Sequence, residues 1–480
     1  MQLAALVGSR GLLPLGEYLG RYQTAGAGWL ARLYDFPTLL WIAHPDWLLT
    51  ALPLAGAALA ILLILGVGGR VVPALLWLLY LSSVVAARDF FYYQWDNLLL
   101  ETTFLAIFLP ARGTLAGAIR RRPLPEPSPV VVFLLRWVLF RLLFESALAK
   151  ILYGREDWLT LRGMTYYYET APLPSWGGWL VQQQPLWFHQ GSVLYMFLVE
   201  LLLPFFIFLP RRFRIAFFLL HLPFQISIGL TSNYGFFNLL SLVLSLLVLE
   251  DRDLEGAARL WRRLRRRAPA VGAAATQQGA APPAPAAGAA TPAGRPGVGG
   301  PAPAAPLPWP RRMLRHAPWL LAACIVPASL MEASGYLLRG TAFDRALVRA
   351  RALYAPLRTV NVYHLFPGIV RQRIVAEIEG TQDGASWVPY RLRYAPGDPG
   401  AAPPMTWLHN PRFPFNYSFF TLGRGRRDVE YLENLARRLC CDPGAVAGLM
   451  EPNALLESRP QALRMSYYRY RFGTWSDLRA

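Results

Sequence analysis

Long apolar stretches separated by short polar loops dominate the first 340 residues of the chain. A run of about 20 apolar residues is long enough for a helix to cross a bilayer. The candidate runs are residues 47–69, 71–87, 91–110, 130–153, 192–210, 213–231, 234–249 and 317–338. Several of them are short enough for a tilted or re-entrant helix. The pattern therefore predicts a polytopic α-helical membrane bundle of about eight apolar spans.

The segments around these spans follow other patterns. Residues 1–46 are too polar and too often interrupted by Gly and Pro to span, and they lack the regions of a signal peptide. Residues 252–316 begin as a basic run and continue as an Ala/Pro-rich tract, which predicts a disordered linker. Residues 339–480 alternate apolar and polar positions on both sides of the turn TQDG, which predicts a hairpin. A helix over 429–440 and an aromatic strand over 466–472 complete a small C-terminal β-rich domain.

Arginines give the predicted bundle, residues 47–251, an orientation. They fall on one side if the spans alternate: Arg70, Arg112, Arg120 to Arg122, Arg211, Arg212, Arg214 and the run 262–267. By the positive-inside rule this side is cytoplasmic, together with the 252–316 linker. Residues 1–46, the loop 154–191 and the 339–480 domain then face outward, and 317–338 is the last transmembrane helix. An initial helix missing from this sequence stays open, since no span precedes the outward-facing N-terminal segment.

The composition agrees with a membrane protein and indicates the kind of organism that encodes it. Apolar residues make up 54% of the chain and charged residues only 16%, which is unusual for a soluble protein of 480 residues. The net charge of +19 comes from arginines at span ends, and no basic helix, finger or aromatic platform indicates nucleic-acid binding. Lysine occurs once, as Lys150, amid abundant Arg, Ala, Gly and Pro, a bias typical of a G+C-rich bacterial genome.

Ionisable and polar side chains inside the apolar spans are the first candidates for function, because each charge costs at least ~2.5–3.5 kcal/mol at mid-bilayer. Arg141 and Glu145 are four residues apart and are predicted to pair along one helix face, whereas Lys150 lies off that face. Asp96 and Glu101 are predicted partners for the nearby cations. The whole predicted intramembrane polar network is Arg141, Glu145, Lys150, Asp96, Glu101, Glu200, His221 and Asn233.

Two interpretations of this network stay open. In the first, the charges pair only to fix the packing of the bundle. In the second, Lys150 is a base, neutral because it is desolvated, with Glu145, Asp96 and Glu101 around it. His221 has no cluster of ligands at metal-binding spacing, so neither a metal nor another cofactor is predicted. No GxSxG, HExxH, P-loop or GxGxxG motif is present, which argues against a lipase in its own right.

The loop YYYETAPLPSWGGW is rich in aromatic residues that suit either an interfacial belt or a protein-binding surface. Its candidate contacts for a client protein are Tyr166, Tyr167, Tyr168, Glu169 and Trp176. Two prolines constrain the shape of the loop more than simple anchoring requires. Anchoring on lipid headgroups and contact with a client both remain open.

Several motifs in combination resemble the lipase maturation factor family: GSRGLLP, QWDNLLLETTFLAIFLP, FRLLFESALAK with its downstream DWL, TYYYETAPLPSW, VELLLPFFIFLPRRFR, TSNYGFFNLLSLVLSLLVLEDRD and IEGTQDGASWVPYRLRYAPGD. Eukaryotic members are endoplasmic-reticulum membrane proteins that help secreted dimeric lipases reach their active fold. For a bacterial chain the resemblance implies an inner-membrane factor whose partners are the lipid bilayer and an exported lipase-like client.

The chain departs from the family pattern at a few positions. Ala147, Tyr167, Ala171 and Ser232 stand where the family usually has Gly, His, Gln and Gly. The segment LHNPRFPFNYSFF keeps His409 and Arg412, which the resemblance makes client-contact candidates, but lacks the Asp-Trp that usually follows. The lysine followed by DWL is also similar to the membrane domain of vitamin K-dependent gamma-carboxylase, which implies proton chemistry at Lys150.

Three functional hypotheses follow. The leading one is a non-enzymatic, chaperone-like maturation factor that holds a partly folded lipase with the 154–191 loop and the C-terminal domain. The alternative is a membrane-embedded enzyme acting on a lipid or quinone-like substrate with Lys150 as base. The third is a structural membrane protein whose ion network serves only packing.

Overall fold

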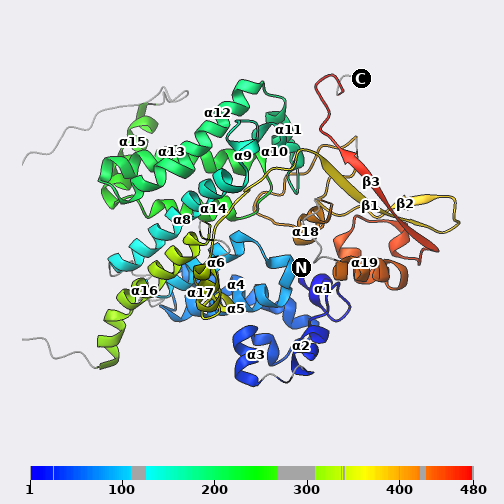
Figure 1. Ribbon diagram of the computed structural model, residues 1–480, viewed down its shortest axis with the longest axis horizontal. Coiled ribbons are helices and arrows are strands. Elements are labelled where there is room, and N and C mark those ends of the chain that lie inside the picture. The colour runs from blue at the N-terminus through cyan, green and yellow to red at the C-terminus, as the bar shows by residue number, and fades with distance from the viewer. Residues whose placement is uncertain are drawn as a thin grey trace, which may run out of the picture. The chain divides into compact units, whose positions relative to one another are not determined.

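The computed structural model describes residues 2–24, 26, 28–109, 126–267, 309–336, 338, 341–398, 400–421 and 429–477 (Figure 1). Its contacts divide the chain into two compact units, Met1–Val248 with Pro318–Ala480, and Leu249–Ala317. The second unit holds α15 (Asp251–Arg267) and the first turns of α16 (Trp309–Ser334). Most of the predicted disordered linker, residues 268–308, lies outside the described residues.

Apolar helices form the body of the first unit. They are α4 (Asp46–Ile64), α5 (Val71–Ala87), α6 (Gln94–Ala106), α8 (Pro129–Tyr153), α12 (Leu186–Phe197), α13 (Arg211–Thr231), α14 (Phe237–Leu246) and the later part of α16. The 154–191 loop adds the short helices α9 (Arg155–Trp158), α10 (Met164–Thr170) and α11 (Trp176–Gln182). The prediction that this part of the chain is a bundle of apolar helices is confirmed.

Five helical stretches in the described residues are long and apolar enough to cross a membrane: Asp46–Ile64, Val71–Phe91, Leu186–Phe208, Arg211–Thr231 and His316–Ser334. They match five of the eight predicted spans. The other three differ for physical reasons. Helix α6 has only 13 residues, α14 has only 10, and α8 has 25 but carries four charged side chains. The chain is thus a multi-pass membrane protein, and length and apolarity identify five of the eight predicted spans within the described residues.

The N-terminal segment packs against the C-terminal helices. It forms α1 (Leu3–Val7), α2 (Leu15–Thr24) and α3 (Trp29–Asp35). The buried residues of α1 and α2 share a core with α18 (Arg412–Phe420) and α19 (Val429–Cys441). One apolar core joins both ends of the chain, with Leu6 and Leu12 beside Phe413 and Leu435. Polar contacts add to it, including an ion pair of Arg10 with Asp442. The two ends of the chain therefore form one body.

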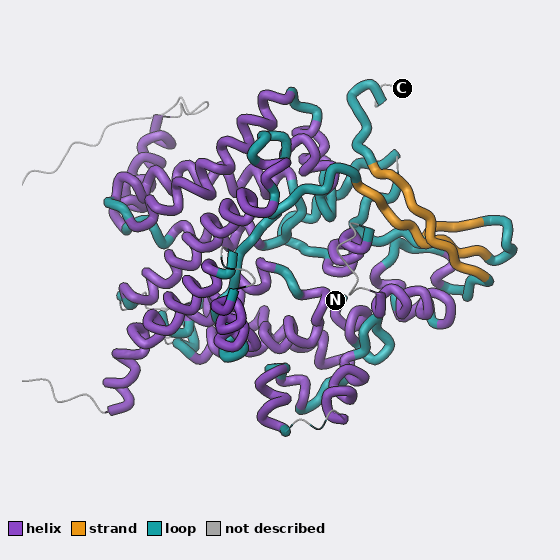
Figure 2. Tube along the Cα trace, in the orientation of Figure 1, coloured by secondary structure: helices purple, strands orange, loops and turns teal. Residues whose placement is uncertain are grey.

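A small antiparallel sheet lies in the C-terminal part (Figure 2). Its strands are β1 (Arg373–Thr381), β2 (Trp387–Pro389) and β3 (Ala462–Tyr470), in the order β2-β1-β3. The predicted hairpin is confirmed as β1 and β2, and Asp383 Oδ1 accepts from the Ala385 and Ser386 amides in its turn. The predicted helix over 429–440 is α19. The last strand begins four residues before the predicted start, because it pairs with the full length of β1.

A long connection leads from the bundle to this sheet. After α17 (Ala342–Arg351) and the 3₁₀ turn η5 (Ala355–Leu357), residues 358–372 run as an extended segment to β1, visible as a teal tube in Figure 2. We name residues 358–366 the strap. It lies against α6, α8 and the 154–191 loop, and its contacts position most of the polar groups described next.

Candidate functional site

The strap bonds three of the buried charged side chains of α6 and α8, those of Glu101, Arg141 and Glu145. Arg141 forms an ion pair with Glu101 and donates from Nη1 to the Asn361 carbonyl at 2.9 Å. Glu101 Oε2 also accepts from the Tyr363 hydroxyl at 2.8 Å and from Asn361 Nδ2 at 3.1 Å. Glu145 accepts from the Tyr363 amide at 2.8 Å, so the predicted pairing of Arg141 with Glu145 is replaced by bonds to neighbouring elements. All these side chains are buried, and their hydrogen bonds offset the loss of hydration.

Asp96 belongs to a second, separate pair. Its two carboxylate oxygens accept from Arg412 of α18 at 2.6 and 2.7 Å, and Tyr80 donates to it at 2.6 Å. The Arg412 guanidinium also stacks on the Phe91 ring, 3.9 Å from its centroid. A bidentate pair of this kind fixes α18 on α6. Arg412, predicted to contact a client, is buried in this clamp.

Lys150 pairs with Glu200 at 2.5 Å, and both side chains are buried. Glu200 lies on η3 (Leu198–Leu202), a π-helical turn of the kind often found at functional positions. The ammonium also faces the Trp158 ring, 5.6 Å from its centroid. Glu145, Asp96 and Glu101, predicted to surround Lys150, are each bonded to other elements, because the strap and α18 supply partners that the sequence pattern could not reveal.

His221 and Asn233 have structural contacts. His221 Nε2 lies 3.2 Å from the Ser241 hydroxyl, and its ring stacks on Phe217. Asn233 donates to the carbonyls of Leu173 and Pro404 and accepts from the Thr406 amide at 2.8 Å. It thereby joins the aromatic loop to the C-terminal part. Within the described residues, no three His, Cys, Asp or Glu side chains are grouped to hold a metal ion.

The aromatic loop divides into a buried part and an exposed part. Tyr167 and Tyr168 are buried and Tyr166 is half-buried, whereas 51% of Trp176 is exposed. The Glu169 carboxylate accepts from the Phe472 amide at 2.9 Å, just past β3. His409 is exposed, with its ring 5.1 Å from that of Tyr394. Of the predicted client contacts, therefore, Trp176 and His409 are the most accessible.

Arg373 at the start of β1 holds the loop to the sheet. Its guanidinium donates to the carbonyls of Ala171 and Pro172, and it lies 5.4 Å from the centroid of the Tyr470 ring. Burial lowers the pKa of Arg373 to about 10, which still leaves it charged at neutral pH. Burial also raises the pKa of Tyr470 to about 12, so that its hydroxyl stays neutral. One charged side chain thus holds two consecutive carbonyl groups of the loop.

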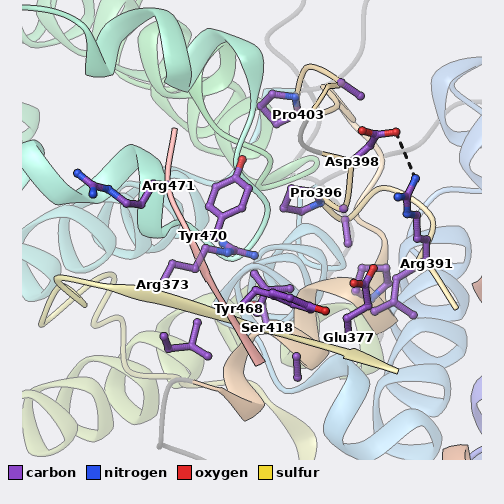
Figure 3. A pocket seen from close by; sticks show the side chains of 18 of the residues that line it. Arg373, Glu377, Arg391, Pro396, Asp398, Pro403, Ser418, Tyr468, Tyr470 and Arg471 are labelled. Carbon is purple, nitrogen blue, oxygen red and sulfur yellow. Dashed lines mark hydrogen bonds and ion pairs between the residues drawn. The ribbon is translucent and has the colours of Figure 1, made fainter. Parts of the chain in front are cut away.

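A cavity of about 790 Å³ opens between the loop and the sheet (Figure 3). Aromatic side chains line it from both sides, Trp176 and Trp179 from α11 and Tyr468 and Tyr470 from β3. Residues 395–398 and 400–403 and the α18 side chains Tyr417 and Ser418 complete the walls. Its size and mixed lining are those of a ligand or peptide site. Two regions predicted to act together, the 154–191 loop and the C-terminal domain, therefore share one cavity.

Comparison with known proteins identifies the family. The model of the lipase maturation factor transmembrane domain matches residues 1–256, and that of the lipase maturation factor C-terminal domain matches residues 359–480. Lipase maturation factor 1 of Bos taurus is 31% identical over 484 residues, which cover 97% of this chain and 79% of the relative. The chain belongs to the lipase maturation factor family.

Other members of the lipase maturation factor family match to different extents. Lipase maturation factor 1 of Mus musculus is 28% identical over 98% of this chain and 78% of its own length. Lipase maturation factor 2 of Homo sapiens is 39% identical over 53% of this chain and 37% of its own length. No solved structure matches the chain. These animal relatives lend no support to the predicted bacterial origin, and nothing in the comparisons supports the gamma-carboxylase resemblance.

The sequence did not predict the strap, nor the bonds of Arg373 to the loop carbonyls of Ala171 and Pro172, which we name the latch. Asn361 and Tyr363 lie in a segment with no periodic pattern, far along the chain from the helices that they contact. The alternation in β1 predicted the strand of Arg373 but not its partners in the loop. One feature of the sequence pointed to a segment such as the strap: the apolar spans hold more carboxylates than nearby cations, so some carboxylates need partners from another part of the chain. The Gly-Gly pair of SWGGW pointed to a close contact between helices. A Cβ on Gly177 would lie 2.0 Å from the Leu230 carbonyl oxygen. Only glycine permits α11 to approach α13 so closely.

Proposed function

We propose that this protein is a membrane-bound, chaperone-like maturation factor that assists the folding or assembly of exported lipases or related hydrolases. The observation that carries the proposal is the aromatic cavity shared by the 154–191 loop and the C-terminal sheet, in a chain 31% identical to bovine lipase maturation factor 1. Tyr and Trp side chains give large contact areas at low entropic cost, which suits binding of varied, partly folded surfaces. The client residues favoured by exposure are Trp176 and His409.

The pairs in the bundle support this function indirectly. Arg412 with Asp96 and Arg373 with the loop carbonyls hold the C-terminal part on the membrane helices. Both walls of the cavity are therefore fixed relative to the bilayer. A client emerging at the membrane would meet a preformed site instead of a mobile domain, which lowers the entropy lost on binding.

The test is the specific activity, per secreted molecule, of the host's exported lipases in a strain lacking this gene. We expect activity per molecule to fall while secreted mass changes less, and wild-type protein to restore it. A Trp176→Ala variant should restore it incompletely, and Trp187→Ala, at an exposed position outside the cavity, should restore it fully. Unchanged lipase activity on deletion would refute the function.

We also infer an even number of membrane crossings. Residues 1–45 share a core with α18 and α19, so both ends of the chain lie on one side of the membrane. Five crossings would separate them. The 154–191 loop shares the cavity with the C-terminal sheet and therefore lies on the same side, so α12, α13 and α16 require a fourth crossing after the loop. Helix α14 is the remaining apolar helix of the described residues in that part of the chain. With positive-inside orientation, the shared side is extracytoplasmic, and the bacterial inner membrane stays the proposed location.

Impermeant maleimide reagents check the topology. The exposed Cys440 and Cys441 and a cysteine at Glu17, each in a chain whose other cysteines are serine, should react from the same side of sealed vesicles. Reaction from opposite sides would rule out an even number of crossings.

The second candidate is a membrane-embedded enzyme acting on a lipid or quinone-like molecule with Lys150 as base. It is favoured by one observation, the buried contact of Lys150 with Glu200 on a π-helical turn. The two functions differ in their requirement for the amine. A chaperone tolerates replacement of the pair by apolar side chains, whereas an enzyme does not.

A further inference from the structure

One edge of β1 is only partly covered in the described part of the chain. β3 pairs with β1 along its whole length, whereas β2 pairs with residues 379–381 alone. The Ile378 carbonyl accepts from the Tyr390 amide at 2.7 Å and therefore points to the β2 edge. Main-chain groups alternate between the two edges of an antiparallel strand. The main-chain N–H and C=O groups of Ile374 and Ala376 therefore point to the edge that carries β2, at positions that β2 does not reach.

This uncovered edge opens into the aromatic cavity, which both residues line. The Ile374 carbonyl accepts from the Thr421 hydroxyl at 2.6 Å, in agreement with the alternation. Neither β2 nor β3 reaches the Ala376 N–H and C=O on this edge. Main-chain groups that no neighbouring strand reaches are a template for pairing with another strand.

The walls of the cavity suit an extended peptide. Side chains of such a strand would meet Tyr468 and Trp176 on one face and Tyr417 and Ser418 of α18 on the other. A bound segment of four extended residues would be about 13 Å long. Figure 3 shows Arg391 paired with Asp398 at one end and Arg373 beside Tyr470 at the other.

The end near Tyr470 carries three arginines and, close to Arg373 and Tyr470, one carboxylate, Glu169. Arg373 is opposite Tyr470 in the sheet register, and Arg469 and Arg471 flank it along the chain. The acidic Glu377 lies four register positions from Arg373, beside Arg391. Charge complementarity therefore favours an acidic side chain at the Arg373 end of the occupant.

We propose that an extended, mainly apolar segment of the client, with an acidic residue toward Arg373, adds as a strand to the edge of β1 at Ile374 and Ala376. This inference rests on the proposed maturation function and specifies how the client is held. Main-chain hydrogen bonds give affinity that depends little on side chains, while pockets beside the strand select among segments. Such recognition distinguishes an unfolded client, whose strands are free, from a folded one.

Photo-crosslinking on β3 tests the location. Benzoylphenylalanine replaces either Tyr468, which lines the cavity, or its neighbour Tyr467, which does not; they are 50% and 59% exposed. With the full-length protein in cells secreting a lipase, we expect at least tenfold more lipase adduct from position 468. Equal adducts, or adducts from 467 alone, would overturn the proposal. An adduct between two copies of this chain at 468 would also overturn it, because the edge would then serve self-association.

Hydrogen exchange tests the strand pairing itself. Adding unfolded lipase to the purified full-length protein should slow exchange of the Ala376 amide by about tenfold or more. The Glu377 amide, whose edge already pairs with β3, is the internal control and should change little. Crosslinking at 468 without protection of Ala376 would mean docking by side chains and would reject strand addition. If deletion of the gene lowers lipase activity but position 468 captures no lipase, this inference alone fails; if deletion changes nothing, the proposed function fails.

Discussion

The bundle and the sheet differ in whether their polar groups have partners within the chain. In the bundle, Arg141, Lys150 and Asp96 each have a charged partner within the chain, and all are buried. Around the sheet, Trp176 and Tyr468 are half exposed and part of one strand edge faces a cavity. Charges in a membrane interior must be paired to be stable, whereas a binding surface must leave some contacts unmade. The difference assigns support to the first region and recognition to the second.

The largest expected effect is at the centre of the bundle. Glu101→Ala leaves Arg141 buried without its carboxylate and removes the acceptor of Tyr363 and Asn361. Loss of one partner of a buried pair costs about 3–5 kcal/mol, so little folded protein should remain. Thermal unfolding in detergent measures the loss. The double variant Arg141→Met, Glu101→Leu should recover part of the lost stability. If it recovers none, the contacts of Glu101 with the strap contribute more to stability than its ion pair with Arg141.

Next in size is the pair that separates support from catalysis. Lys150→Met alone leaves Glu200 buried without its partner and should cost about 3 kcal/mol. Adding Glu200→Leu removes the unpaired carboxylate, so both stability and lipase maturation should return toward wild type. The measurements are thermal unfolding and specific lipase activity in complemented cells. A double variant that folds like wild type but does not mature lipase would contradict the division of roles and favour Lys150 as a base.

A smaller effect is expected at the latch between the two regions. Arg373→Met removes two charge-assisted hydrogen bonds to the loop carbonyls of Ala171 and Pro172. Each such bond contributes about 1.5–3 kcal/mol, part of which the loop regains from water. Exchange of amides at 171–176 should accelerate and lipase maturation should fall, with the bundle unaffected.

Arg371→Met is the matched control: Arg371 also joins the 154–191 loop, through Glu156 and Asp157, but its own side chain is 55% exposed, so these pairs contribute less. If both variants behaved alike, the latch would have no special role in positioning the loop.

The sequence alone could predict the elements of both regions but only part of their connections. Periodicity identified the apolar helices, the hairpin and α19, since these depend on local patterns. The buried charges were also identifiable, because an ionised side chain in an apolar run is conspicuous. Their partners were not: Glu101 pairs 40 residues away and Asp96 pairs with Arg412, 316 residues away. Asn361 and Tyr363 lie in an aperiodic strap whose position depends on tertiary packing alone.

The smallest expected effect is a pH dependence confined to the sheet. Arg464 and Ser466 of β3 hydrogen-bond the Glu379 carboxylate of β1, and these bonds lower the pKa of Glu379. A carboxyl whose folded pKa is depressed stabilises the fold at pH above its ordinary value near 4.5 and loses that contribution as the pH falls further. The pair is partly exposed, so the loss should accelerate amide exchange across β1 and β3 only about two- to fivefold. Glu379→Gln should abolish the pH dependence, and exchange in the bundle should be insensitive over the same range. A dependence that survives in Glu379→Gln would assign it to another group, and one that extended into the bundle would show that the sheet and the membrane helices are less independent than their polar contacts indicate.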